Sequence, residues 1–406
     1  MDRQALTKRF EHAQANWFDL LAVRAPRILI VQRDNIGDLV LITPFLHALK
    51  ACLPEATLDV LVNSYNAAAI EHNPDVSRRF SYVKAKHREP GQSRWSIYWS
   101  TFALWRELRR ARYDLAVLMT GRVANSSLRP ALASRAQRIA AFADPNHAPR
   151  SVDLAVECEN SSNTHVVTRS GSMLAAITPR QLREARWPGE LPNCRVYADP
   201  AVCHVLRGRL LASLGVLDCP LIGIHVSARK VDQRWPAANF AALMHRLHAQ
   251  LGCAFMLFWS PGTSQNAQHP GDDGKIKDIR GLVQGLPVFA HETPQLPLLI
   301  AGLSLPHILV CSDGGAMHLA AALGCPIVAM FGNSDPRVWH PWGSPYVVLR
   351  STSQKVVDLS VEHVAAAVRQ LLQQTREQSD PKRSNGDRHM MEVSASARQV
   401  NEDLDS

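Results

Sequence analysis

One stretch of the sequence, residues 308–332, combines an acid, two adjacent glycines and a histidine where a strand is expected to join a helix. The stretch contains, in order, an apolar strand at 308–310, Asp313, Gly314, Gly315 and a helix at 316–323 that includes His318. A glycine pair leaves backbone N–H groups uncovered at the positive end of the helix, where an anion binds. With a carboxylate and an imidazole nearby, this pocket suits a nucleotide-sugar better than bare phosphate. The alternative is that the glycines only allow close packing of strand and helix.

A second glycine–acid pair, Gly37-Asp38, follows a buried strand at 28–31 and precedes an apolar helix at 39–49. Asp38 therefore lies beside the carboxyl end of a strand, where open α/β sheets bind their ligands. Pro44 either kinks this helix or marks the start of its regular part. The alternative role for Asp38 is to cap the helix N-terminus, which aspartate commonly does.

Polar and basic residues that follow other strands are the remaining binding candidates. The strand predicted at 221–226 leads into a basic loop at 227–234, which contains Ser227, Lys230 and Arg234. Weaker candidates are Arg33, Asn35, Lys84, Lys86 and Arg122. They would contact the acceptor, the molecule that receives the sugar from a nucleotide-sugar. The charges of residues 84–94 are expected to lie on a solvated loop, and the alternative is contact with a phosphorylated acceptor.

Strands and helices alternate along most of the chain, which predicts an α/β fold with parallel sheets. Buried strands are expected at 28–31, 57–62, 115–119, near 138–139, and at 221–226, 254–259, 308–310 and 327–331. Further helices are expected at 63–70, 105–112, 200–214, 239–250 and 296–301, and a long polar loop at 261–275. Because the alternation restarts after a linker, we expect two α/β halves with a cleft between them.

The expected divisions of the chain follow from these patterns. They are an N-terminal amphipathic helix at 1–25, a first domain at 26–190, a linker and helix at 191–215, a second domain at 216–356, a C-terminal helix at 357–374 and a disordered tail at 375–406. The apolar stripe of the first helix favours packing on its own domain, with anchoring on a membrane surface as the alternative. The tail is polar and has few apolar residues to anchor it.

Composition narrows the class of protein. The 406 residues are 46% hydrophobic, and no apolar run approaches the roughly 20 residues that span a bilayer. The N-terminus lacks the apolar core of a signal peptide, and the eight cysteines are scattered, so we expect a cytoplasmic protein without a disulfide framework or metal site. The net charge of +9 favours a polyanionic partner, either a phosphorylated sugar or an anionic lipid surface. No nucleic-acid-binding motif or block of Lys and Arg is present, which argues against nucleic acid.

Four segments together resemble the heptosyltransferase family, glycosyltransferase family nine. They are Gly37-Asp38, the short strand that ends near Arg138, the Arg234-Trp235-Pro236 sequence before a helix, and residues 312–322 with the following Gly324-Cys325-Pro326. The resemblance covers about residues 26–372 in consistent order. It implies the GT-B fold, two facing Rossmann-like domains with a cleft between them. The first domain would then hold the acceptor, and the second would bind the nucleotide-sugar.

The resemblance also implies roles for individual residues. Asp38 matches the family's general base, which deprotonates the acceptor hydroxyl. Asp313 matches the acid that contacts the donor sugar, and Gly314 and Gly315 match the amide donors to the pyrophosphate. His318 matches the family histidine, placed near the donor phosphate, and Arg138 is given a structural role.

The sequence departs from the family pattern at three places. Gln233 stands where the family carries a lysine that neutralises the diphosphate, so Lys230 or Arg234 is the expected substitute. Gly314 stands where threonine is common. The loop after the 254–259 strand lacks the usual glutamate for the ribose, and Asn266 or Asp272 would take its place.

By resemblance, the chain transfers heptose from ADP-heptose to a phosphorylated lipopolysaccharide inner-core acceptor, inverting the anomeric carbon and using no metal and no cofactor. Such a displacement needs one base at the acceptor oxygen and positive charge near the departing diphosphate. The chain has neither a Walker A loop nor G-x-G-x-x-G, which argues against an NTPase or a dehydrogenase. The enzyme is expected in the cytoplasm, with peripheral contact at the inner leaflet. The alternatives are another nucleotide-sugar donor, or a non-catalytic nucleotide-sugar-binding protein.

Overall fold

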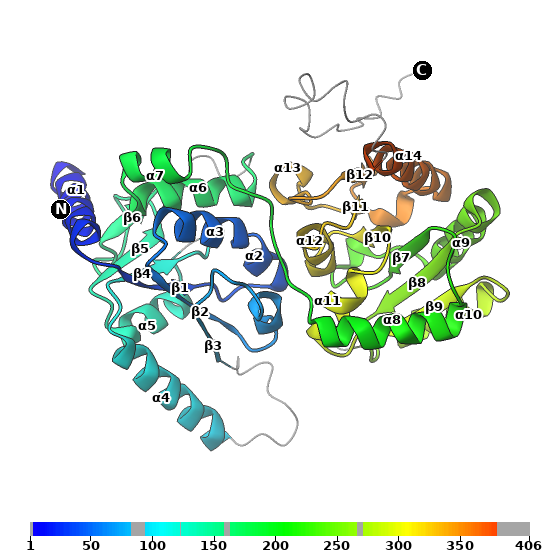
Figure 1. Cartoon of the computed structure of the whole chain (residues 1–406), viewed down its shortest axis with the longest axis horizontal. Helices are drawn as coiled ribbons and strands as arrows, with labels where there is room; N and C mark the ends of the chain where they lie inside the picture. Colours follow the sequence, from blue (N-terminus) through cyan, green and yellow to red (C-terminus); the bar gives the residue numbers. More distant parts are fainter. Residues whose placement is uncertain (1–2, 83–93, 122, 158–162, 266–270, 380–406) are drawn as a thin grey trace. The chain divides into compact units, whose positions relative to one another are not determined.

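The computed structural model describes residues 3–82, 94–121, 123–157, 163–265 and 271–379 (Figure 1). The chain divides into two compact units, a first unit of Met1–Tyr197 and a second unit of Ala198–Ser406. Each unit contains one six-stranded sheet in which every described pair of neighbouring strands is parallel. The α/β fold class with two Rossmann-like units is therefore confirmed.

The first unit consists of α1 (Arg3–Val23), β1 (Arg27–Val31), α2 (Ile36–Val40), α3 (Thr43–Cys52), β2 (Thr57–Asn63), η1 (Ala67–Ile70), β3 (Arg78–Tyr82), α4 (Arg94–Ala111), β4 (Leu115–Leu118), α5 (Asn125–Ser134), β5 (Arg138–Phe142), β6 (Leu154–Val156), α6 (Val166–Ile177) and α7 (Arg180–Arg186). Its strand order is β3-β2-β1-β4-β5-β6. In the central register Val31, the last residue of β1, lies opposite Leu61 of β2 and Leu118 of β4. The carboxyl ends of these strands therefore share one edge of the sheet.

The second unit consists of α8 (Pro200–Leu214), β7 (Leu221–His225), η3 (Val231–Gln233), α9 (Ala237–Leu251), β8 (Ala254–Trp259), α10 (Asp273–Leu282), β9 (Val288–Glu292), α11 (Leu296–Leu303), β10 (Ile308–Ser312), α12 (Gly315–Ala322), β11 (Ile327–Phe331), α13 (Pro336–Trp339), β12 (Tyr346–Arg350), η4 (Val356–Asp358) and α14 (Val361–Ser379). Its strand order, β12-β11-β10-β7-β8-β9, repeats that of the first unit. Helices α9, α10 and α14 share a buried apolar cluster with one face of the sheet.

The predicted strands are the inner strands of the two sheets. Central strands of parallel sheets are covered on both faces, so they appear in the sequence as continuous apolar runs. The four strands that the sequence did not predict, β3, β6, β9 and β12, are the four edges. Edge strands expose polar side chains, and Arg78 and Arg79 of β3 illustrate this.

Several predicted boundaries were wrong. Residues 63–70 were expected to form a helix, but β2 continues to Asn63 and only the short 3₁₀ turn η1 follows, because two asparagine side chains there bind a neighbouring loop. The loop expected at 261–275 ends earlier, since α10 begins at Asp273. The helix expected at 105–112 starts at Arg94, and α6 and α7 were not predicted.

Pro44 marks the start of a helix and not a kink within one. The apolar helix expected at 39–49 is divided into α2 and α3, with Pro44 in the first turn of α3. The disordered tail expected from 375 was wrong for its first five residues, because α14 continues to Ser379, and residues 380–406 lie outside the described residues.

The N-terminal helix packs on its own unit, as the favoured interpretation held. Trp17 of α1 is completely buried, and its indole N–H donates to the backbone oxygen of Ile177 at 2.7 Å. The Gln14 side-chain amide donates to the backbone oxygen of Ala176 at 2.7 Å. In the described part of the chain, no helix combines the length and hydropathy that a membrane span requires.

Candidate active site

In both units the candidate residues follow the two strands at which the order of connections reverses. In the first unit this point lies between β1 and β4, and in the second between β7 and β10. Open parallel sheets of this strand order bind ligands outside the carboxyl ends of these strands. Asp38 comes after β1, the loop 227–234 after β7, and Asp313 after β10.

Asp38 lies in the first turn of α2 and is half-buried. Its carboxylate oxygen Oδ2 accepts the backbone N–H of Asn35 at 3.0 Å and the Asn35 side-chain amide at 3.1 Å. Asn35 occupies the N-cap position, and Asp38 is the acid three residues later that completes a capping box. The expected alternative role at the helix start is therefore present in part, although Asp38 itself is not the cap. These bonds orient the carboxylate at the sheet edge.

The loop that precedes Asp38 is held by buried amides from the end of β2 and the start of η1. The side-chain amides of Asn63 and Asn66 donate to the backbone oxygen of Asp34 at 2.9 Å and 3.0 Å. Both asparagines are at most 1% exposed. The Tyr65 hydroxyl accepts the backbone N–H of Ile36 at 3.1 Å. Sequence reasoning missed these residues, although two asparagines at the end of an apolar strand are an unusual polar signal.

A small polar cavity of about 210 Å³ opens at the same edge of the first sheet. Its lining comes from the loop after β1, the last residue of β3, the loop after β4 and the first turn of α5, and it consists of Arg33, Asp34, Tyr82, Thr120, Gly121, Ala124 and Ser126. The Arg33 guanidinium lies 4.0 Å from the centre of the Tyr82 ring, a cation–π contact. A cation, a carboxylate and hydroxyl groups around a space of this size suit one sugar residue. Of the acceptor candidates, Asn35 is exposed, and Lys84, Lys86 and Arg122 lie outside the described residues.

The carboxylate of Asp313 in the second unit is held by side chains. Its Oδ2 accepts the Gln233 side-chain amide at 2.9 Å and the Ser334 hydroxyl at 2.6 Å. The Gln233 amide also donates to the Ser334 hydroxyl oxygen at 2.9 Å. Burial raises the pKa of Asp313, and the bond from Ser334, the charge of Lys230 and the bond from Gln233 oppose that rise. Gln233, at the family's lysine position, therefore positions Asp313 without supplying a charge.

Gly314 and Gly315 form the turn into α12. Gly314 has extended backbone, with φ of 162° and ψ of −171°, so its conformation does not require glycine. A Cβ atom added there would meet no heavy atom within 4 Å. The turn is therefore open on the side where the missing threonine side chain would lie.

His318 lies one turn into α12 and is only 4% exposed. Burial, with a smaller contribution from His340, lowers its pKa to about 4, so the imidazole is neutral near pH 7. Its Nδ1 has no hydrogen-bond partner among the described residues, and its ring lies 6.4 Å from the Trp339 ring, centre to centre. Without a bound anion, His318 therefore carries no positive charge near pH 7.

The loop after β7 contains the basic candidates. Lys230 is exposed, whereas the Arg234 guanidinium donates from Nε to the backbone oxygen of Ala228 at 3.0 Å. The Ser227 hydroxyl accepts the backbone N–H of Ser260 at 2.9 Å, so it ties this loop to the loop after β8. Of the two expected substitutes for the family lysine, Lys230 is the one whose charge affects Asp313.

Gly332, directly after β11, allows two loops of the site to approach. A Cβ at this position would lie 2.6 Å from the Asp232 carboxylate and 2.9 Å from its backbone oxygen. The same carboxylate accepts the backbone N–H of Asn333 at 3.0 Å. This approach places Ser334 next to Gln233.

Asn266 and Asp272 are the two candidates for binding the ribose of the donor. Asn266 lies outside the described residues. Asp272 is 8% exposed and lies 3.5 Å from the Lys275 ammonium nitrogen, which also donates to the backbone oxygen of Val226 at 3.1 Å. Asp272 is therefore occupied by an internal ion pair. Across the described residues, no group of three His, Cys, Asp or Glu side chains is arranged to hold a metal ion.

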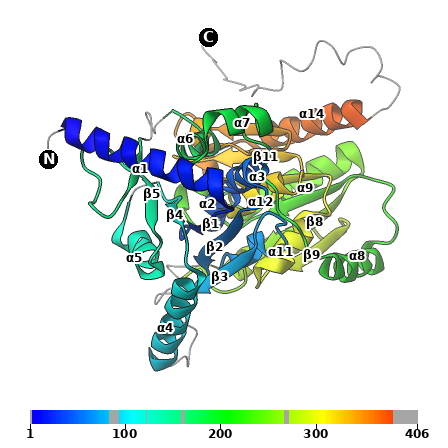
Figure 2. The same cartoon turned by 60° about the vertical axis from the view of Figure 1, so that its left-hand side comes forward.

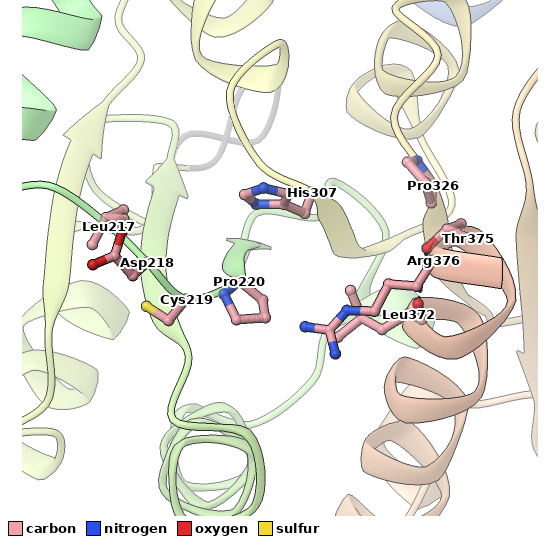
Figure 3. Close-up of a pocket in the computed structure, with 9 residues that line it drawn as sticks. All are labelled: Leu217, Asp218, Cys219, Pro220, His307, Pro326, Leu372, Thr375 and Arg376. Atoms are coloured by element: carbon pink, nitrogen blue, oxygen red, sulfur yellow. Dashed lines mark hydrogen bonds between the residues drawn. The ribbon is translucent and has the colours of Figure 1, made fainter. Parts of the chain in front are cut away.

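A larger cavity of about 670 Å³ lies at the opposite edge of the second sheet (Figure 3). It is lined by residues that precede β7, β10 and β11, among them Pro220, His307 and Pro326, and by the end of α14. In Figure 3 the Arg376 side chain extends from α14 toward Pro220. Because it lies at the amino ends of the strands, this cavity is not the place where such sheets bind ligands. Arg138, expected near the end of a strand, instead begins β5, at the amino edge of the first sheet.

Comparison with known proteins gives one consistent result. The model of glycosyltransferase family 9 (heptosyltransferase) matches residues 101–369. Lipopolysaccharide heptosyltransferase 3 of Escherichia coli is 24% identical over 322 residues, which cover 76% of this chain and 84% of that protein.

Solved structures agree with this match. The structure of a family 9 glycosyl transferase from Veillonella parvula has a TM-score of 0.71 at 18% identity and covers 86% of this chain and 97% of its own. An E. coli heptosyltransferase solved with ADP has a TM-score of 0.64 at 18% identity and covers 85% and 99%. At these identities the structures show a shared fold.

Proposed function

Since the chain belongs to glycosyltransferase family 9, the heptosyltransferases, we propose that it transfers heptose from ADP-heptose to a phosphorylated sugar of the lipopolysaccharide inner core. One observation carries the proposal. Each unit presents an oriented acid where the order of its strands reverses, Asp38 after β1 and Asp313 after β10. A relative with ADP bound supports an adenine nucleotide donor.

The proposed reaction is a single displacement that inverts the anomeric carbon. The Asp38 carboxylate takes the proton of an acceptor hydroxyl while that oxygen attacks the anomeric carbon of the donor. The bond from this carbon to the diphosphate oxygen breaks, and ADP leaves with the electron pair. Asp38 suits the role because its Oδ2 is fixed by two bonds from Asn35 while the side chain remains half-exposed.

The departing diphosphate needs stabilisation by positive charge or hydrogen-bond donors. We assign this to the backbone N–H groups of Gly314 and Gly315 at the start of α12, together with the Lys230 ammonium group. Gln233 and His318 are neutral, so neither contributes charge. In this proposal protein groups take the place of a metal ion.

Asp313 and the cavity of the first unit determine which sugars bind. The Asp313 carboxylate accepts hydroxyl groups of the donor sugar, in an orientation fixed by Gln233 and Ser334. The cavity lined by Arg33 and Tyr82 takes the acceptor residue, and Arg33 pairs with an anionic group on it. In the proposed reaction, the donor bound at Asp313 reacts with the acceptor bound at the Arg33–Tyr82 cavity.

A different nucleotide-sugar donor is the second candidate function. Gln233 in place of the family lysine and the open space at Gly314 favour it, because both change the surroundings of the diphosphate. Calorimetric titration with ADP, UDP and GDP separates the two. Tightest binding of ADP supports the first candidate, and tighter binding of UDP or GDP supports the second.

The direct experiment is a transfer assay with the purified chain, ADP-heptose and deacylated core oligosaccharide from a strain in which this gene is deleted. A mass increase of one heptose on the acceptor, with release of ADP, is the expected result. Binding of ADP-heptose without transfer to any core acceptor would instead indicate a non-catalytic binding protein. We place the reaction at the cytoplasmic face of the inner membrane, since the proposed acceptor is attached to a lipid.

A further inference from the structure

Helix α4 has one face that packs on the first unit. Leu108 is completely buried and Ala111 is 5% exposed. Leu104 packs on the same apolar cluster, which contains Phe80 of β3 and Leu128 of α5. The spacing of 104, 108 and 111 places these three side chains on one side of the helix. Figures 1 and 2 both show α4 extending from the β3 end of this sheet.

The opposite face of α4 exposes aromatic side chains. Trp99 is 68% exposed, Phe102 55% and Trp105 37%. Trp99 and Phe102 contact each other edge to face, with ring centres 6.2 Å apart. Single exposed apolar residues are ordinary, but three large aromatic residues within seven positions of one helix form a contiguous apolar patch.

Arginine side chains interleave with this patch. Positions 99, 102, 106 and 109 recur at the spacing of one helix face, so Arg106 lies in line with the two aromatic rings. Arg109 follows on the same line, but its Nε donates to the backbone oxygen of Ala133 in α5 at 2.9 Å, so its guanidinium is partly engaged within the unit. Arg110 is the exposed neighbour of Arg109. The helix sequence contains four arginines and a single acid, Glu107, which the same spacing places to one side of this line. The exposed face of α4 is therefore aromatic and cationic.

We propose that this face of α4 docks the first unit on the surface of an anionic phospholipid bilayer. Tryptophan and phenylalanine insert at the level of the headgroups, and arginine pairs with the anionic headgroups around them. A nucleic acid or a flat protein surface fits less well, because the exposed rings lie on the convex outer side of one helix rather than in a groove between elements. The net charge of +9 attracts the whole chain to the same surface.

The inference rests on the proposed function in one respect, because a lipid-attached acceptor gives an enzyme reason to bind a bilayer. The test uses the full chain and flotation with phosphatidylcholine vesicles that do or do not contain phosphatidylglycerol. The double variant Trp99→Ser/Phe102→Ser removes the two most exposed rings of α4. The matched control, Val205→Ser/Leu211→Ser, removes two exposed aliphatic side chains from α8, which also has arginines.

The expected result is binding to vesicles that contain phosphatidylglycerol, at least about tenfold weaker in the α4 variant and unchanged in the control. Circular dichroism spectra that match wild type show that both variants fold. Equal binding of the α4 variant, or no binding of wild type, would overturn the proposal. Concentration-dependent dimerisation that the α4 variant abolishes, without vesicle binding, would assign the face to a second copy of the chain instead.

Transfer assays with a soluble and a vesicle-embedded acceptor distinguish failure of the docking proposal from failure of the proposed function. The α4 variant is expected to transfer heptose to a soluble deacylated acceptor at the wild-type rate and to an acceptor embedded in vesicles at a reduced rate. Vesicle binding by a chain that transfers no heptose would leave the docking face intact and reject the proposed function. Transfer that is equal on both acceptors in wild type and variant would reject the docking face alone.

Discussion

The two units share one strand order but hold their acids in different ways. Asp38 of the first unit is fixed by bonds from Asn35 within its own turn, and it remains half-exposed. Asp313 of the second unit has a similar, intermediate exposure, but it receives side chains from two other loops, Gln233 and Ser334. The common topology therefore sets where each acid lies, and the source of its hydrogen bonds distinguishes the two. In the proposed reaction Asp38 takes a proton from the acceptor, and Asp313 binds the donor sugar.

The largest effect is expected from Asp38→Asn. Asparagine keeps an oxygen that accepts the Asn35 N–H but cannot take a proton, so transfer should fall by about 10²–10⁴-fold. Donor affinity, measured by calorimetry, should stay within about twofold because Asp38 is assigned to the acceptor side. The control is Asp144→Asn, an exposed acid of the same unit. Transfer within about tenfold of wild type would remove Asp38 from the role of base.

Acid should weaken the second unit through two buried histidines. Burial lowers the pKa values of His225 and His318 to about 4, from an ordinary value of 6.5. Their neutral forms are favoured in the folded state, so stability is full above about pH 6.5 and falls as the pH drops toward about 4, by about 3 kcal/mol for each histidine.

The measurement is urea unfolding between about pH 7 and about pH 5, combined with hydrogen exchange resolved by peptide. Exchange should rise with acid in β7 and α12. In His318→Leu, which has no proton to gain, the loss of stability with acid should be smaller. An unchanged pH dependence in that variant would show that His318 titrates normally in the folded chain.

A smaller effect is expected from Asp313→Asn. The amide oxygen can still accept from Gln233 and Ser334, and burial disfavours the charge that is removed, so the unfolding temperature should not fall. The donor sugar loses a charged acceptor, and kcat/KM should drop by about 10–100-fold. Asp278→Asn on the exposed surface of α10 is the control. An unfolded Asp313→Asn protein would make this acid structural and weaken the contrast with Asp38.

The smallest effect is expected from Gly314→Thr. The backbone there is extended and the space is open, so the free energy of unfolding should change by less than about 0.5 kcal/mol. One added hydroxyl next to the amides of the turn should tighten ADP binding by about 2–10-fold. Gly208→Thr on α8, where space is also open, should leave ADP affinity unchanged. Weaker ADP binding in Gly314→Thr would indicate that the donor itself occupies this space.

The sequence predicted the inner strands and the turns that carry the acids, because both depend on local patterns. Residues covered on two faces are uniformly apolar, and Gly-Asp or Asp-Gly-Gly after such a run is visible in a few residues. The edge strands were not predicted because their exposed faces are polar, as at Arg78 and Arg79.

The hydrogen-bond donors that hold the Asp313 carboxylate could not be predicted from the sequence. Gln233 and Ser334 are 80 and 21 residues from Asp313 along the chain, and only the folded register of β7, β10 and β11 brings them together. The expectation that His318 lies near a phosphate rested on its place one turn after the glycine pair and on its match to the family histidine. The structure adds that the ring is buried, which spacing cannot reveal.

The buried amides of Asn63 and Asn66 have a consequence for how this enzyme can diversify. They hold the loop before Asp38 through its backbone, whereas Thr120 and Ser126 of the neighbouring cavity come from a separate segment. Under the proposed function, substitutions in that segment would change which acceptor is chosen and would leave the Asp38 carboxylate in place. Such a division would let descendants of one ancestral gene acquire new acceptors by single steps, each of them still active.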